Sequence, residues 1–206
     1  MNLRYELIDN KNIILATRVQ LKIFPGEIAY PCYKMSIEDH EHYKYYLVYN
    51  NDVIIGVTGL YTECDYKDDS IWLGWYGVLK EYRLHGFGKQ ILLDTIEMAK
   101  EEVKNNPRIK YLRLYTSLEE NKVAQILYKK YMEISEYYEN DDDINYDHTC
   151  LIYTKRLNEN VHLELWNSRF INLRAGSESM SEGLKEFMEI TNGDINVQIS
   201  PAGEVF

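Results

Sequence analysis

One segment constrains the fold of this chain more than any other. An apolar, aromatic-rich run covers residues 71–78, a turn with the sequence Arg83-Leu-His-Gly86-Phe-Gly88 follows, and an amphipathic stretch covers residues 88–104. This order predicts a strand, a loop and a helix. The start of such a helix has unpaired backbone N–H groups and the positive end of the helix dipole, and glycine lets a ligand approach the backbone closely. The segment therefore predicts an anion site, with a pyrophosphate as the obvious ligand.

Two familiar phosphate-binding patterns do not fit this turn. A dinucleotide site needs a third glycine three positions after the second, and Ile91 stands there. A P-loop needs Gly-Lys-Ser/Thr after a four-residue spacer, which the turn lacks. The remaining alternatives are a different phosphate-bearing ligand and a purely structural glycine turn.

The rest of the chain alternates between strand and helix patterns. Residues Asn50-Asn51-Asp52 separate two β-rich runs and predict a hairpin. The expected helices are 12–24, 88–104, 121–132 and 179–190, and the expected strands are 45–49, 53–61, 71–78, 111–116 and 148–157. Shorter pieces are a helical or irregular stretch at 37–43, β-like runs at 161–166, 170–173 and 195–199, and an acidic segment at 136–147. The pattern predicts an α/β (α+β) sheet with helices on its faces.

Two motifs carry a resemblance to a known family. Arg83-x-x-Gly86-x-Gly88 resembles the acetyl-CoA signature Arg/Gln-x-x-Gly-x-Gly/Ala of the GNAT superfamily of N-acetyltransferases. A second segment, in which strand 111–116 leads into a helix with Asn121, Ala124 and the pair Leu127-Tyr128, is similar to a later family segment. The two motifs stand in the family's order, and the resemblance covers about residues 1–157.

The resemblance implies a fold and a division of the chain. The expected fold is a GNAT-like mixed, mostly antiparallel central sheet, with a V-shaped splay between two central strands and helices on both faces. Residues 1–157 would form an acetyl-CoA-binding N-acetyltransferase domain. Residues 158–206 would form a small C-terminal extension that packs on this domain or on a partner subunit.

The resemblance also implies acetyl-CoA as co-substrate and assigns its contacts. Backbone groups near the end of strand 71–78 would pair with the pantetheine arm, and the amides of the glycine turn would hold the pyrophosphate. The cofactor-binding residues expected from this alignment are Tyr76, Gly77, Val78, Arg83, Leu84, His85, Gly86, Phe87, Gly88, Lys89 and Asn121. Capping of the following helix is an equal alternative for Asn121.

The catalytic residues are less clearly marked. Tyr128 stands where the family's general acid lies, and a phenol can donate a proton to the departing thiolate. A buried aromatic is the alternative role for this residue. Glu63 is the candidate general base, and a water chain or one of the histidines His40, His42 and His148 is the alternative. Arg113 and Leu114 occupy the region where relatives carry a catalytic glutamate.

Composition narrows the partners. The net charge of −10 argues against nucleic acid and favours a small cationic amine as acceptor. The acidic residues of 63–69 and the run 141–143 could flank the acceptor entrance. The three cysteines show no metal spacing and suggest a reducing, cytoplasmic location, and no stretch predicts a signal peptide or membrane helix. A homodimer is one open alternative for the oligomeric state.

These observations predict an acetyl-CoA-dependent N-acetyltransferase that acts on a primary amine. Two alternatives stay open. The first is a catalytically silent acyl-CoA-binding or sensing module. The second is an enzyme that uses another acyl-CoA or acetylates a protein or peptide amine.

Overall fold

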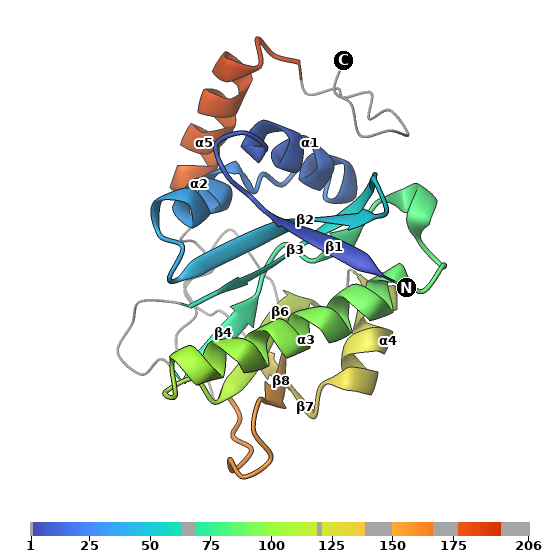
Figure 1. Ribbon diagram of the computed structural model, residues 1–206, viewed down its shortest axis with the longest axis vertical. Coiled ribbons are helices and arrows are strands. Elements are labelled where there is room, and N and C mark those ends of the chain that lie inside the picture. The colour runs from blue at the N-terminus through green and yellow to red at the C-terminus, as the bar shows by residue number, and fades with distance from the viewer. Residues whose placement is uncertain (1, 63–68, 119–120, 139–149, 167–176, 195–206) are drawn as a thin grey trace. The chain divides into compact units, whose positions relative to one another are not determined.

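The computed structural model describes residues 2–62, 69–118, 121–138, 150–166 and 177–194 of the 206-residue chain (Figure 1). The chain divides into two compact units. The first unit consists of Met1–Tyr61, Gly74–Leu92 and Asn172–Phe206, and the second consists of Thr62–Leu73 and Leu93–Ile171.

Four strands of the first unit pair antiparallel in the order in which they occur. They are β1 (Leu3–Leu7), β2 (Tyr43–Asn50), β3 (Val53–Tyr61) and β5 (Gly77–Val78). The predicted hairpin is confirmed as β2–β3, and Asn51 in its turn has a left-handed backbone (φ +54°), which asparagine tolerates. Strand β1 was not expected from the sequence.

Helices cover both faces of these strands. One face packs against α1 (Ile13–Ile23) and α2 (Tyr30–Glu38), and the other packs against the start of α3 (Phe87–Asn105). Helix α5 (Ser177–Ile190) adds Phe187 to the core on the side of α1 and α2. The predicted helices 12–24, 88–104 and 179–190 are confirmed. The helical or irregular piece expected at 37–43 contains the last residues of α2 and the turn after it, and the helix itself begins earlier, with Pro31 in its first turn, where a missing N–H costs nothing.

Helix α5 packs against α2 (Figure 1). Phe187 is fully buried, and its ring centroid lies 5.7 Å from that of Tyr30. Lys34 Nζ lies 3.0 Å from Glu186 Oε2, and a Cβ atom at Gly183 would come within 2.3 Å of the Pro31 side chain. This part of the C-terminal region is therefore closely fitted to α2. The domain boundary at residue 157 stays a prediction.

The second unit contains a mixed group of four strands. Their order is β4 (Ser70–Leu73), β6 (Tyr111–Ser117), β8 (Cys150–Arg156) and β7 (Ile134–Tyr138), with β4–β6 parallel and the other pairs antiparallel. Helix α4 (Lys122–Tyr131) and most of α3 belong to this unit. The predicted elements 111–116, 121–132 and 148–157 are confirmed within one or two residues.

Two strand predictions need correction, and one further strand was not expected. The unexpected strand is β7 at residues 134–138, which includes the start of the acidic segment 136–147. Residues 161–166 are irregular, because their backbone groups bond to side chains of the strands instead of to another strand. The expected strand 71–78 is interrupted at 74–76 and becomes β4 and β5. The runs expected at 170–173 and 195–199 lie outside the described residues.

The fold class predicted from the sequence is confirmed. The pairing within the units is mixed and mostly antiparallel, and helices pack on the strands. The V-shaped splay stays a prediction.

Candidate functional site

The predicted strand, loop and helix form in the first unit as expected. Strand β5 ends at Val78, a short 3₁₀ turn η1 (Lys80–Tyr82) follows, and α3 begins at Phe87. The Gly86 carbonyl accepts the first intrahelical bond, from Gln90 N–H at 3.1 Å. Gly86 is therefore the N-cap of α3, and the amides of Phe87 and Gly88 belong to the first turn, where the helix dipole favours an anion.

The loop before α3 has an unusual backbone. Leu84 has φ +65° and Gly86 has φ +84°, and the Leu84 side chain is 96% exposed. Glycine adopts a positive φ without penalty, whereas leucine does so at a cost of about 1 kcal/mol. Strain of this kind concentrates at ligand sites.

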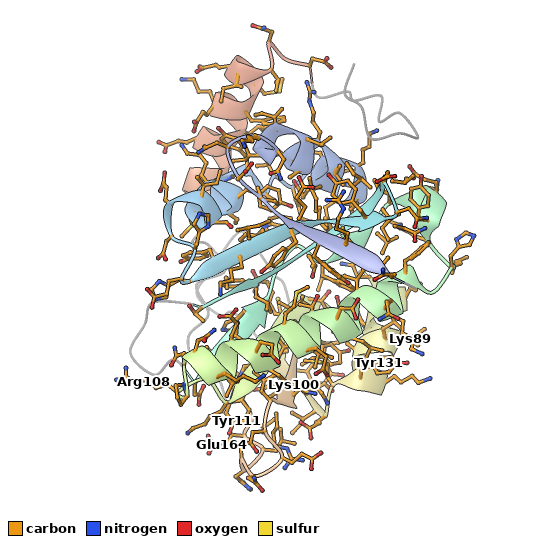
Figure 2. The ribbon with its side chains drawn as sticks, in the orientation of Figure 1. Lys89, Lys100, Arg108, Tyr111, Tyr131 and Glu164 are labelled. Atoms are coloured by element: carbon orange, nitrogen blue, oxygen red, sulfur yellow. The ribbon has the colours of Figure 1, made fainter. Side chains whose placement is uncertain are left out.

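Basic side chains surround this loop, and two of them also shape it. Arg83 Nε donates to the Val78 carbonyl at 2.9 Å, which fastens the loop to the end of β5. His85 Nδ1 lies 2.7 Å from the Arg83 carbonyl oxygen. Lys89, labelled at the start of α3 in Figure 2, adds a third basic residue. Together they place positive charge around the helix start, in agreement with an anionic ligand.

Among the described residues strand β5 pairs only with β3, so its other edge is open there. Leu79 N–H donates to the Ile55 carbonyl at 2.9 Å, and Val78 faces Gly56 across the β3–β5 pair. Along an antiparallel pair, the N–H groups of successive residues point alternately toward and away from the partner strand. Because the N–H of Leu79 points toward β3, the N–H of Val78 points away from it. This edge can accept a ligand that binds as an additional strand.

Two glycines fix the position of β5. A Cβ atom at Gly56 would lie 2.3 Å from the Gly77 carbonyl oxygen, and a Cβ atom at Gly77 would lie 2.4 Å from Cγ2 of Ile23. Neither site accepts a side chain without movement of the backbone or of α1. The lack of a side chain at Gly56 and Gly77 therefore allows β5 to pack closely against β3 and α1.

The break between β4 and β5 is centred on Trp75, whose φ of +47° is rare for a bulky residue. The Trp75 ring packs edge to face on Phe24, with centroids 5.7 Å apart. Its indole is also hydrogen-bonded to the thiol of Cys32, whose pKa is raised by burial. These contacts from α1 and α2 hold Trp75 in its strained conformation.

Tyr128 lies in the second unit, buried on α4. Its ring packs on that of Tyr153, with centroids 5.3 Å apart. The Tyr153 hydroxyl is buried and has no hydrogen-bond partner among the described residues, and burial raises the pKa of this phenol. The sequence pattern does not indicate that Tyr153 lies beside Tyr128.

Asn121 precedes α4 with a left-handed backbone (φ +55°), and its side chain makes no capping hydrogen bond. Asn121 is nevertheless the N-cap residue of α4, because its carbonyl accepts the first intrahelical bond, from Gln125 N–H at 3.0 Å. The end of β6 is tied to α4 by Gln125, whose side-chain amide donates to the carbonyls of Ser117 and Leu118 at 3.0 and 3.1 Å. Glu63 and the run 141–143 lie outside the described residues.

Arg113, in the region where relatives carry a glutamate, is fully buried in the second unit. It donates to Ser70 Oγ at 3.0 Å, Thr154 Oγ1 at 2.6 Å and the Glu164 carbonyl at 3.2 Å. Its guanidinium also lies over the ring of Tyr111, at 4.6 Å, and that of Trp166, at 5.3 Å. Figure 2 labels Tyr111 and Glu164 of this cluster. These contacts make Arg113 an anchor for residues 158–166.

Two searches of the described ranges are negative. No helix there is long and apolar enough to cross a membrane. No group of three or more His, Cys, Asp or Glu side chains within the same ranges could hold a metal ion.

The geometry is that of an α/β protein in which a helix start suited to an anion lies next to the edge of strand β5. The family model described as acetyltransferase (GNAT) family matches residues 17–133, which is more than half of the chain. The chain therefore belongs to this family, and the resemblance seen in the sequence is confirmed. A search of curated proteins finds no significant match.

Solved structures support the same fold. A GNAT acetyltransferase from Elizabethkingia anophelis with acetyl-CoA bound matches with a TM-score of 0.54 and 22% identity, covering 75% of this chain and 98% of that one. A chimeric spermidine N-acetyltransferase from Vibrio cholerae matches at 0.59 and 15%, covering 76% and 96%. The ribosomal-protein-S18-alanine N-acetyltransferase from Escherichia coli matches at 0.55 and 15%, covering 79% and 100%.

As a member of this family the protein is an acetyl-CoA-dependent N-acetyltransferase, with acetyl-CoA as co-substrate. The described residues fit that molecule. The first turn of α3 suits a pyrophosphate, and the open edge of β5 at Val78 suits an extended amide-bearing arm.

Proposed function

We propose that the protein transfers the acetyl group of acetyl-CoA to the primary amine of a small cationic acceptor. The observation that carries the acceptor class is the charge of −10, together with the acidic runs at 63–69 and 141–143. A negative surface raises the local concentration of a cationic amine. One of the similar structures is a spermidine N-acetyltransferase, in agreement with such an acceptor.

In this proposal the loop and the strand divide the cofactor between them. The amides from Leu84 to Lys89, with Gly86, Phe87 and Gly88 between them, hold the pyrophosphate, and the side chains of Arg83, His85 and Lys89 add positive charge. Main-chain groups of Tyr76, Gly77 and Val78 pair with the pantetheine arm, and Asn121 hydrogen-bonds the same arm. The outward direction of the Val78 N–H and the N-cap geometry of Gly86 support this division.

The reaction requires movement of two protons. The acceptor amine loses a proton before its nitrogen attacks the thioester carbonyl, because an ammonium has no lone pair. The C–N bond forms, the C–S bond breaks, and the nitrogen gives up a second proton to become the neutral amide. The CoA thiolate takes up one proton, so one of the two protons lost by the nitrogen is released to solvent. The Val78 N–H would polarise the carbonyl as a fixed dipole.

We assign the proton donor to Tyr128 and the base to Glu63. A phenol with an ordinary pKa of about 10 stays protonated at neutral pH and can donate as the thiolate forms. The burial of Tyr128 and its packing on Tyr153 restrict the motion of the ring, as a positioned donor requires. Glu63 is assigned from the sequence alone.

A second candidate acceptor is the amine of a protein or peptide. The similar E. coli structure is named for the alanine of ribosomal protein S18, which favours this alternative. A catalytically silent acyl-CoA-binding module is the third candidate, suggested by Arg113 and Leu114 in the region of the family's glutamate.

One assay separates these candidates. Release of CoA thiol from acetyl-CoA is measured with polyamines, with monoamines and with peptides that have a free N-terminus. Turnover with polyamines supports the proposal, and turnover with peptides alone supports the second candidate. Binding of acetyl-CoA without turnover on any amine indicates the silent module.

The site assignments have their own tests. Gly86→Glu introduces bulk and negative charge at the pyrophosphate position and should abolish CoA binding in calorimetry, so unchanged affinity contradicts the loop assignment. Tyr128→Phe should lower turnover far more than acetyl-CoA affinity. Equal activity would remove Tyr128 from the mechanism.

Three further properties complete the proposal. The location is cytoplasmic, as the unpatterned cysteines suggest. Residues 1–157 form the catalytic domain and 158–206 an extension, and a homodimer is compatible with the sequence. Size-exclusion chromatography with light scattering tests the oligomeric state.

A further inference from the structure

A side-chain hydrogen bond joins the two parts of the site in the first unit. The hydroxyl of Tyr76, the residue directly before β5, donates to the carbonyl oxygen of Gly88 in the first turn of α3 at 2.6 Å. Burial raises the pKa of the Tyr76 phenol, so the hydroxyl stays protonated and able to donate. Its ring packs on the cluster of Ile55, Val78 and Ile91, which fixes its direction.

The loop between Tyr76 and Gly88 needs a contact of this kind to keep one conformation. It contains Leu84 and Gly86 with left-handed backbones, and its exposed side chains bury little apolar surface to hold it in place. The bond from Arg83 reaches back to the Val78 carbonyl, and the contact of His85 is local to the loop. The Tyr76 bond reaches across the loop to the helix itself.

We propose that Tyr76 is a positioning residue that sets the spacing between the pantetheine-binding edge and the pyrophosphate-binding helix start. This inference rests on the proposed division of acetyl-CoA between β5 and α3. The two parts of the ligand are covalently joined, so the strand edge and the helix start must be held at one spacing before binding. If the free protein already holds this spacing, binding of the ligand loses less conformational entropy, and the affinity is higher.

The test compares Tyr76→Phe with the matched control Tyr82→Phe. Tyr82 lies in the same loop and packs on the same cluster, so its substitution also removes one phenol hydroxyl near the site. Affinities for CoA and for pantetheine, which lacks the pyrophosphate, are measured by calorimetry. Hydrogen exchange of residues 87–92 in the free proteins reports directly on the hydrogen bond between Tyr76 and Gly88.

Loss of one neutral hydrogen bond predicts about a three- to tenfold change. The advantage of CoA over pantetheine should fall by this factor in Tyr76→Phe and keep its wild-type value in Tyr82→Phe, and exchange at 87–92 should be faster in Tyr76→Phe alone. An equal loss for both ligands means that Tyr76 only stabilises the fold, and it overturns the inference. Failure of the wild-type protein to bind CoA overturns the proposed function itself.

Discussion

Replacement of Arg113 by methionine is expected to destabilise the protein, although it removes a buried charge. The side chain makes three hydrogen bonds, to Ser70, Thr154 and the Glu164 carbonyl, and two cation–π contacts. At about 1.5 kcal/mol for each bond and about 1 kcal/mol for each ring, these contacts are worth roughly 6 kcal/mol. Burial of a guanidinium costs several kcal/mol, which methionine recovers, so the net loss should be about 3 kcal/mol.

Urea unfolding measures this loss. For a chain of this size, about 3 kcal/mol should lower the midpoint by roughly 1 M. Arg156→Met is the matched control, because Arg156 also reaches residues 158–166, through the carbonyls of Glu159 and Val161, but lies at the surface. Its effect should be much smaller. Near-ultraviolet circular dichroism should also change in Arg113→Met, because the guanidinium lies over the ring of Trp166, which packs edge to face on Trp72.

A second variant tests the balance of terms. Arg113→Lys keeps a buried charge but loses the planar fork that reaches three acceptors, so it should be at least as unstable as the methionine variant. If Arg113→Met equals or exceeds the wild-type protein in stability, the cost of burying the charge outweighs its bonds, and Arg113 is not an anchor.

Three further substitutions test local features. Gly77→Ala should cost about 1–3 kcal/mol of unfolding free energy and weaken CoA binding, because the new Cβ would lie 2.4 Å from Cγ2 of Ile23; unchanged calorimetry in both respects contradicts this fit. Leu84→Asn should raise the Tm of the free protein, since asparagine tolerates a positive φ better than leucine, and an unchanged or lower Tm would argue against strain at this residue. Burial acts to raise the pKa of Glu133, but the hydrogen bonds and positive charge of Arg156 together have the larger, opposite effect. The pKa of Glu133 therefore lies below its ordinary value of 4.5. The wild-type protein should therefore have a larger free energy of unfolding than Glu133→Gln above pH 4.5, and this difference should vanish as the pH falls through the lowered pKa in an acid titration. A difference in unfolding free energy that does not depend on pH would rule out this linkage.

The elements that the sequence predicts well are those with local causes. The hairpin turn at Asn51 and the glycine loop before α3 depend on backbone preferences of a few neighbouring residues, and both form as expected. The break at Trp75 was missed because its causes, Phe24 and Cys32, lie far away in the chain. A positive φ in tryptophan has no local sequence signal.

Other misses have a similar origin. Strand β7 was not expected because it includes the start of an acidic segment, and its Glu136 carboxylate accepts the N–H of Trp166 at 2.6 Å. The alternating pattern at 161–166 suggests a strand, but the carbonyl of Glu164 accepts a hydrogen bond from the Arg113 side chain instead of from another strand. In both places a charged side chain replaces a strand partner, and such pairs are visible only once the fold brings them together.

The positions of the three tryptophans have a practical consequence. Trp72 and Trp166 are buried edge to face in the second unit, with ring centroids 4.9 Å apart. Trp75 is half-buried in the first unit, next to the residue that precedes β5. Their emission spectra should therefore differ, and excitation at the red edge selects them over the 19 tyrosines. The protein thus carries unlabelled optical probes, one beside β5 and two in the core of the second unit, so changes at β5 and unfolding can be followed separately in one fluorescence titration.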